Sequence, residues 1–120
     1  MDLIGLAKRL PLPGETVQGE SFYTSPGGKG ANQAVAAARL GGTVKMVGRV
    51  GNDLFGRDLI ENLRINRVNV DGIATDTSNS SGIAMILLDS TRQNHILAIY
   101  GANLSCNEEQ INALESTLEE

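Results

Sequence analysis

Aromatic residues, cysteine and histidine are scarce in this chain of 120 residues. Aromatic residues make up 3% of it, tryptophan is missing, and Cys106 and His95 are the only residues of their types. A single cysteine excludes an internal disulfide and suits a reducing cytoplasm. The shortage of aromatic rings argues against a stacking platform for nucleic-acid bases. Neither Cys106 nor His95 belongs to a cluster with metal-ligand spacing, so we expect no metal site, and neither residue is expected to act as nucleophile or base.

Excess positive charge and long apolar runs are lacking as well. The chain has 10 Lys and Arg against 14 Asp and Glu, a net charge of −4. With this charge we expect no basic patch that could neutralise the phosphates of a nucleic acid, which excludes nucleic acid as a partner. The apolar runs are far shorter than a membrane span, and no signal segment is recognisable, so we expect no membrane insertion. The length and a hydrophobic fraction of 41% predict one globular domain at most.

Glycine is abundant, with 14 residues, and the most informative stretch is glycine-rich. Gly27, Gly28 and Gly30 form a turn that carries Lys29 and Asn32 and leads directly into an apolar helix. Glycine allows a ligand to approach the backbone closely, and the start of the helix presents free N–H groups at the same place. The alternative is an ordinary strand-to-helix turn. Lys29 and Asn32 favour a site that grips a small polar or anionic ligand.

The known nucleotide-binding motifs do not fit this turn. A P-loop requires Gly where Tyr23 stands and Ser or Thr after Lys29, where Gly30 stands. A dinucleotide fingerprint that starts at Gly28 requires a third Gly at the position of Gln33. The turn is therefore not expected to cradle the phosphates of either ligand class.

Strand and helix patterns alternate along the chain, which predicts an α/β domain with a parallel sheet. Asp53 is expected to cap the second helix, whose apolar stripe contains Phe55, Leu59, Ile60 and Leu63. The predicted strands cover residues 3–6, 16–25, 43–50, 83–88 and 95–100, the third of them buried, and the first helix covers residues 31–40.

The last helix is expected to open with a capping box at Ser105 and Glu108. Its apolar spacing predicts that Ile111, Leu114 and Leu118 are buried.

Four motifs together resemble the ribokinase family of carbohydrate kinases, also called the PfkB type. They occur in the order and spacing of that family, and Asp2 precedes them. The motifs are Pro13–Thr16, Gly27–Gly41, Val47–Asp53 with Gly56, and Gly101–Asn103.

The resemblance implies a three-layer α/β core with a small β-sheet lid. The lid is expected from residues 16–25 and about 82–100, with ligands bound between lid and core. Residues 1–120 are expected to be the N-terminal part of one such domain, truncated at both ends. The family's nucleotide-binding half, with its catalytic base, is expected to be absent from this chain.

The resemblance also implies an activity, the transfer of the ATP γ-phosphoryl group to a sugar, with D-ribose as the expected substrate. Asp2, Gly28, Lys29 and Asn32 match the family's sugar-binding positions, and no catalytic residue is expected in this chain. ATP, Mg²⁺ and a monovalent cation such as K⁺ are the implied cofactors, and a homodimer through the lid sheet is the implied assembly. By itself the chain is not expected to phosphorylate anything.

Several alternatives remain open. Asp2 and Lys29, judged only by their neighbours, could be solvated side chains. The substrate could be fructose, a modified sugar or a nucleoside in place of D-ribose. A protein of another class, a non-catalytic sugar-binding or interaction module, could keep the same motifs.

Overall fold

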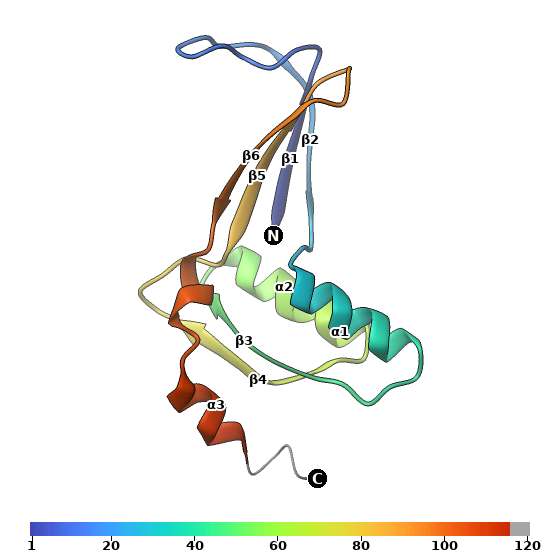
Figure 1. Ribbon diagram of the computed structural model, residues 1–120, viewed down its shortest axis with the longest axis vertical. Coiled ribbons are helices and arrows are strands. Elements are labelled where there is room, and N and C mark those ends of the chain that lie inside the picture. The colour runs from blue at the N-terminus through green and yellow to red at the C-terminus, as the bar shows by residue number, and fades with distance from the viewer. Residues whose placement is uncertain (116–120) are drawn as a thin grey trace.

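The computed structural model describes residues 1–115, and strands and helices alternate as expected (Figure 1). Leu118, expected to be buried, lies outside the described residues. In chain order the elements are β1 (Asp2–Ala7), β2 (Gly19–Ser25), α1 (Lys29–Arg39), β3 (Lys45–Gly51), α2 (Leu54–Ile65), β4 (Asn69–Asp76), β5 (Ile83–Leu88), β6 (Asn94–Ile99), the 3-10 helix η1 (Gly101–Ser105) and α3 (Glu108–Glu115).

Four strands form one sheet in the order β2-β1-β5-β6. The central pair, β1 and β5, is parallel, and the two outer strands are antiparallel to their neighbours. Both segments expected to form a small sheet lie in it. The sequence had not predicted that β1 belongs to the same sheet, between them. The reason is that pairing between residues about 80 positions apart leaves no local sequence signal.

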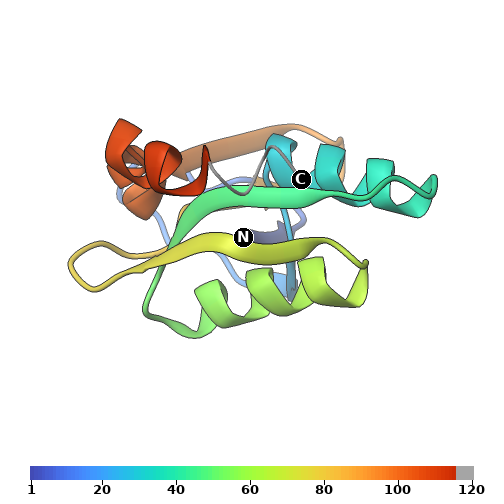
Figure 2. The same ribbon diagram turned by 90° about the horizontal axis from the view of Figure 1, so that it is seen from below.

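The remaining strands, β3 and β4, form a parallel two-stranded sheet that packs against α1 and α2. In Figure 1 both helices lie between this pair and the base of the four-stranded sheet, and Figure 2 shows β3 and β4 side by side from below. The buried core there consists of Ala34, Ala38, Leu63 and Val68. No strand is predicted over β4 from the sequence, because its polar residues and Gly72 interrupt the apolar pattern.

The predicted cap of α2 is confirmed, because the Asp53 carboxylate accepts a hydrogen bond from Gly56 N at 2.8 Å. The third predicted strand is less buried than expected. Residues 45–50 of β3 are only half-buried, and Gly51 alone is buried. A strand with a single neighbour in its sheet leaves much of its surface open.

The predicted start of the last helix is wrong. Ser105 is the final residue of η1, and α3 begins at Glu108, where the Asn107 side chain accepts a hydrogen bond from Gln110 N at 3.0 Å. Ile111 was predicted to be buried and is 49% exposed, while Leu114 is half-buried. The helix is too short and too peripheral for its apolar spacing to ensure burial.

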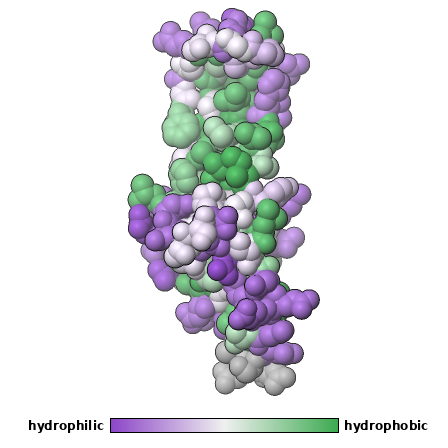
Figure 3. All heavy atoms as spheres, turned by 90° about the vertical axis from the view of Figure 1, so that its left-hand side faces the viewer, coloured by the Kyte–Doolittle hydropathy of each residue, from purple (hydrophilic) through white to green (hydrophobic). Residues whose placement is uncertain are grey.

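The shape is elongated, with extents of 53 × 34 × 20 Å. Its radius of gyration is 16.9 Å, whereas a compact domain of this length has about 14 Å. Hydrophobic side chains gather at the surface over the four-stranded sheet (Figure 3). No helix among residues 1–115 is long and apolar enough to cross a membrane.

One face of the four-stranded sheet, here called the outer face, is apolar and exposed. Residues opposite each other in register share a face, which places Phe22 and Leu87 on either side of Gly5 and Met85 beside Leu97, with Ile99 on the same side. Their exposed fractions range from 41% for Ile99 to 69% for Phe22. An apolar surface of this kind favours association with a partner.

We therefore predict that the isolated chain of 120 residues does not unfold as a cooperative monomer. Leaving apolar surface exposed forgoes about 25 cal/mol per Å², against a net stability of only about 5–15 kcal/mol for a typical domain. Sedimentation velocity should show dimers or larger species, and calorimetry of any monomer should show a broad transition. A sharp, two-state transition from a monomer would contradict the prediction.

Candidate functional site

The glycine-rich turn joins β2 to α1 and leaves the start of the helix open. Gly28 is the N-cap of α1, and its φ of 98° lies in the left-handed region that only glycine adopts freely. No side chain caps the helix, so the first N–H groups of α1 have no side-chain acceptor. Gly28, Lys29 and Asn32 are all exposed on this first turn. The turn thus presents hydrogen-bond donors at the positive end of a helix.

The Asp2 carboxylate lies directly on this turn. In the sheet Asp2 is opposite Ser25, two residues before Gly27. A Cβ atom placed on Gly27 would be 2.5 Å from Oδ1 and 2.6 Å from Oδ2 of Asp2. Gly27 is itself buried, and the carboxylate packs against its backbone in the space that a side chain on Gly27 would need. The fold therefore brings residue 2 to the turn that begins α1.

The side chains of Lys29 and Asn32 make no hydrogen bond or ion pair with other residues in the range 1–115. They stand near the turn with their polar groups available. A carboxylate offers two acceptor oxygens, Asn both donors and an acceptor, and Lys three donors. Such a set can bind a small ligand that is rich in hydroxyl groups.

The sheet face that carries Asp2, here called the inner face, also carries apolar residues that no sequence motif indicates. Asp2 is opposite Ala84, and Ile86 is opposite both Ile4 and Ile96. Ile4 is 8% exposed, whereas Ile96 is 59% exposed. An open apolar strip therefore runs beside the carboxylate. Only the register of β1, β5 and β6 reveals it, because no local pattern marks these positions.

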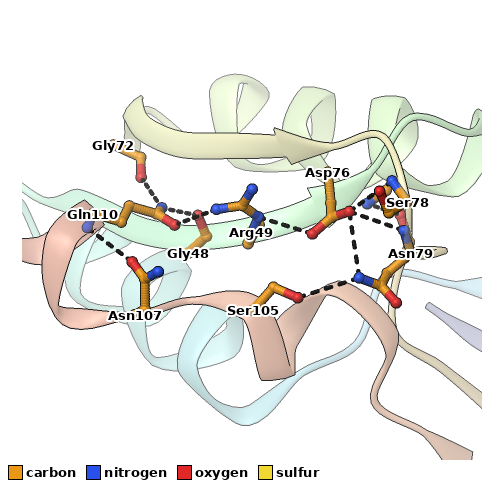
Figure 4. Close-up of polar contacts among 11 residues, drawn as sticks. Gly48, Arg49, Gly72, Asp76, Ser78, Asn79, Ser105, Asn107 and Gln110 are labelled. Carbon is orange, nitrogen blue, oxygen red and sulfur yellow. Dashed lines mark hydrogen bonds and ion pairs between the residues drawn. The ribbon is translucent and has the colours of Figure 1, made fainter.

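A second polar cluster lies on the other side of the β3–β4 pair (Figure 4). Arg49 Nε donates to Asp76 Oδ2 at 3.0 Å, and Asp76 is only 5% exposed. Gln110 of α3 donates to the carbonyl oxygens of Gly48 and Gly72 and so ties α3 to both strands. The cluster is internally satisfied, and its contacts indicate a structural role.

Backbone donors, more than the arginine, set the charge state of Asp76. The N–H groups of Ser78 and Asn79 each donate to Oδ1 at 2.8 Å. These bonds, helped by the Asn79 amide and Arg49 and opposed by burial, lower the pKa of Asp76 from 3.8 to about 2. Asp76 thereby stabilises the turn after β4 in its ionised form.

No group of three or more His, Cys, Asp or Glu side chains within residues 1–115 could hold a metal ion. Where Asp2 lies, the available donors suit hydroxyl groups better than a cation, because Lys29 adds positive charge on the same turn.

Comparison with known proteins gives a consistent result. Residues 1–120 match the pfkB family of carbohydrate kinases. A ribokinase of Mus musculus is 43% identical over 117 residues, 98% of this chain and 36% of that protein. A ribokinase of Bacillus subtilis is 50% identical over 103 residues, 86% of this chain and 35% of that protein. A deoxyribokinase of Salmonella typhimurium is 40% identical over 111 residues, 92% of this chain and 36% of that protein.

A solved structure is similar as well. The structure of Arabidopsis thaliana ribokinase complexed with ribose and ATP matches with a TM-score of 0.80 and 36% identity. The match covers 85% of this chain and 33% of that one. The chain thus spans about a third of the length of the relatives it matches.

The contact between Asp2 and Gly27 can be tested by its effect on stability. Gly27→Ala should reduce the free energy of unfolding by about 1–3 kcal/mol, because its methyl group would overlap the Asp2 carboxylate. Gly30→Ala is the matched control in the same turn. Its Cβ would lie 3.5 Å from Met46 Cε, an ordinary contact, and alanine is favoured over glycine in a helix by about 1 kcal/mol. Urea unfolding of the full-length protein should give different midpoints for the two variants. Equal midpoints would contradict the contact between Asp2 and Gly27.

The lowered pKa of Asp76 predicts how stability changes with pH. Because the folded state binds this proton less readily than the unfolded state, the contribution of Asp76 is fully present above about pH 5. It should be lost as the pH falls through 3.8 toward 2. Asp76→Asn should be less stable than the parent at neutral pH, and the difference should shrink over that window. Exposed Asp58→Asn is the control, and a difference that stays constant down to pH 2 would refute the assignment.

Proposed function

Because this chain belongs to the pfkB family of carbohydrate kinases, we propose that it forms the sugar-binding part of an ATP-dependent kinase that phosphorylates D-ribose. The observation that carries the proposal is the Asp2 carboxylate seated on the glycine-rich turn beside Lys29 and Asn32. The resemblance to ribokinases, and to a structure complexed with ribose and ATP, supports the same substrate class.

In this proposal each polar group binds a different part of the sugar. The two oxygens of Asp2 accept hydrogen bonds from two neighbouring hydroxyls, an arrangement that suits a vicinal diol. Asn32 donates to one hydroxyl and accepts from another, Lys29 donates to sugar oxygens, and Gly28 lets the ring approach the backbone. The apolar strip of Ala84, Ile86 and Ile96 packs against the C–H face of the ring.

These residues bind and orient the sugar, and the chemistry needs further groups. The γ-phosphoryl group of ATP would pass to a primary hydroxyl of the sugar, with positioning and neutralisation of phosphate charge as the main sources of rate. Within residues 1–115 no group of three or more His, Cys, Asp or Glu side chains could hold a metal ion. From the family resemblance, we assign ATP, Mg²⁺, a monovalent cation and the catalytic base to the two thirds of the relatives' length that this chain does not span. ATP as co-substrate and a single free cysteine agree with a cytoplasmic enzyme.

The exposed outer face of the four-stranded sheet supports a homodimer. A second copy of the sheet could cover Phe22, Met85 and Leu97, which are 46% to 69% exposed here. The inner face, with Asp2, would stay free for the sugar. In this arrangement the four-stranded sheet acts as the lid of the sugar site and as the dimer contact.

Deoxyribose is the nearest alternative substrate, since a deoxyribokinase is among the similar proteins. A carboxylate placed to span a diol favours ribose over a sugar that lacks one of the two hydroxyls. A non-catalytic sugar-binding module is the alternative from another class.

A coupled ADP-release assay on the reading frame that contains this chain tests the proposal. The panel should contain D-ribose, 2-deoxyribose, fructose and adenosine, with the isolated 120 residues as the inactive control. Release of ADP with ribose in preference to the other substrates supports the proposal. Activity on fructose or adenosine without activity on ribose rejects the substrate, and binding of ribose without any ADP release favours the non-catalytic module.

In that enzyme, Asn32→Ala should lower kcat/KM for ribose by roughly 10- to 100-fold, because one good polar contact is worth about 1–3 kcal/mol. Gln33→Ala is the matched control, since Gln33 is the next residue of α1 and is also exposed. Steady-state kinetics with ribose varied at saturating ATP measure both. An unchanged kcat/KM in Asn32→Ala would remove Asn32 from the sugar site.

A further inference from the structure

Asp53 makes more contacts than a helix cap needs. Its Oδ1 accepts hydrogen bonds from Gly56 N at 2.8 Å and from Ser81 Oγ at 2.7 Å. Its Oδ2 accepts a hydrogen bond from Ser81 N at 2.8 Å. One oxygen suffices to cap a helix, and Ser or Asn would serve equally well. The second oxygen therefore serves the contact with Ser81.

Ser81 is fully buried, and its N–H group and its hydroxyl are both hydrogen-bonded. Its hydroxyl donates to Asp53 and accepts from Gly51 N at 2.9 Å, and the residue is 0% exposed. A side chain on Gly51 would overlap the backbone at Ser81, and one on Gly101 would overlap the Ser80 carbonyl. The backbone around Ser81 is thus tightly packed between the end of β3 and the start of η1.

Backbone hydrogen bonds connect the segment after Ser81 to the residue before Asp2. Gly82 O accepts a hydrogen bond from Met1 N, and Ala84 N donates to Met1 O, both at 2.9 Å. These bonds begin the parallel pairing of β1 with β5 and set Asp2 opposite Ala84. The contacts of Ser81 therefore hold the start of β5, the strand that carries Ala84, the partner of Asp2 in the sheet.

Building on the proposed function, we propose that Asp53 is a positioning residue for the sugar site. By clamping Ser81 to the N-terminus of α2, it fixes the start of β5 and the place of the Asp2 carboxylate. A residue that only capped α2 would contribute to stability and leave sugar binding unchanged.

Asp53→Asn tests the clamp in the full-length enzyme. Asn keeps an oxygen that can cap α2, but it replaces the second acceptor by an NH₂ group that faces the Ser81 N–H. We expect KM for ribose to rise by about tenfold or more, with kcat and KM for ATP within about twofold of the parent. Ser81→Ala removes only the hydroxyl and should raise KM for ribose in the same direction. This milder variant keeps the test valid if Asp53→Asn fails to fold.

Asn107→Ala is the matched control, because it removes the N-cap of α3 at a distance from Asp2 and should leave both KM values unchanged. An unchanged KM for ribose in Asp53→Asn and Ser81→Ala overturns the inference, as does a parallel loss of kcat and of both substrate affinities.

A second readout separates this inference from the proposed function. In NMR spectra the amide signals of Asp2 and Gly27 should shift in Asp53→Asn and Ser81→Ala and stay in place in Asn107→Ala. If the parent enzyme phosphorylates no sugar, the proposed function fails, and the amide shifts still decide whether Asp53 positions Asp2. Unshifted amides would overturn the positioning role whatever the substrate.

Discussion

The parallel pairing of β1 with β5 is the interaction on which the rest of the structure depends. It joins residues about 80 positions apart and turns two separate antiparallel pairs into one four-stranded sheet. Closing a loop of that length costs about 4 kcal/mol in chain entropy, so the pairing needs support from elsewhere in the fold. The support comes from the packed turn at Ser81, which holds the start of β5 against the end of β3 and the start of α2. The inner face, with Asp2, and the outer apolar face exist only because this sheet forms.

Local chemistry in the sequence predicted the elements that depend on neighbours in the chain. The glycine-rich turn, the helix after it, the hairpin of β5 and β6 and the Asp53 cap all appear at the predicted places. The start of α3 shows the limit of such templates. Ser105 and Glu108 have the spacing of a capping box, but Ser105 lies in a 3-10 turn, so Asn107 takes the capping position. Competition between two short helices is not visible in a four-residue pattern.

Features that depend on distant partners could not be predicted from the sequence. The strand β4 has no continuous apolar run, and it is recognisable only through its pairing with β3. Arg49 and Asp76 lie 27 residues apart and meet because their strands are adjacent. At the candidate site, the sequence indicated Asp2 and the glycine turn through a family resemblance, and the structure places the two in contact. Their role toward a ligand stays a prediction, and the apolar strip beside Asp2 needed the register of the whole sheet.

The alternation of side chains in β1 restricts how this protein can change length. Asp2 points to the inner face and Leu3 to the outer face, so one inserted residue in β1 would exchange the two surfaces at a stroke. The ligand site would gain a leucine, and the exposed apolar surface would gain a carboxylate. Insertions and deletions among related sequences should therefore be rare within β1 and β5 and should concentrate in the loops 8–18 and 89–93. The alternation of side chains along each strand therefore couples the ligand-facing surface to the apolar surface, although the two surfaces have different roles.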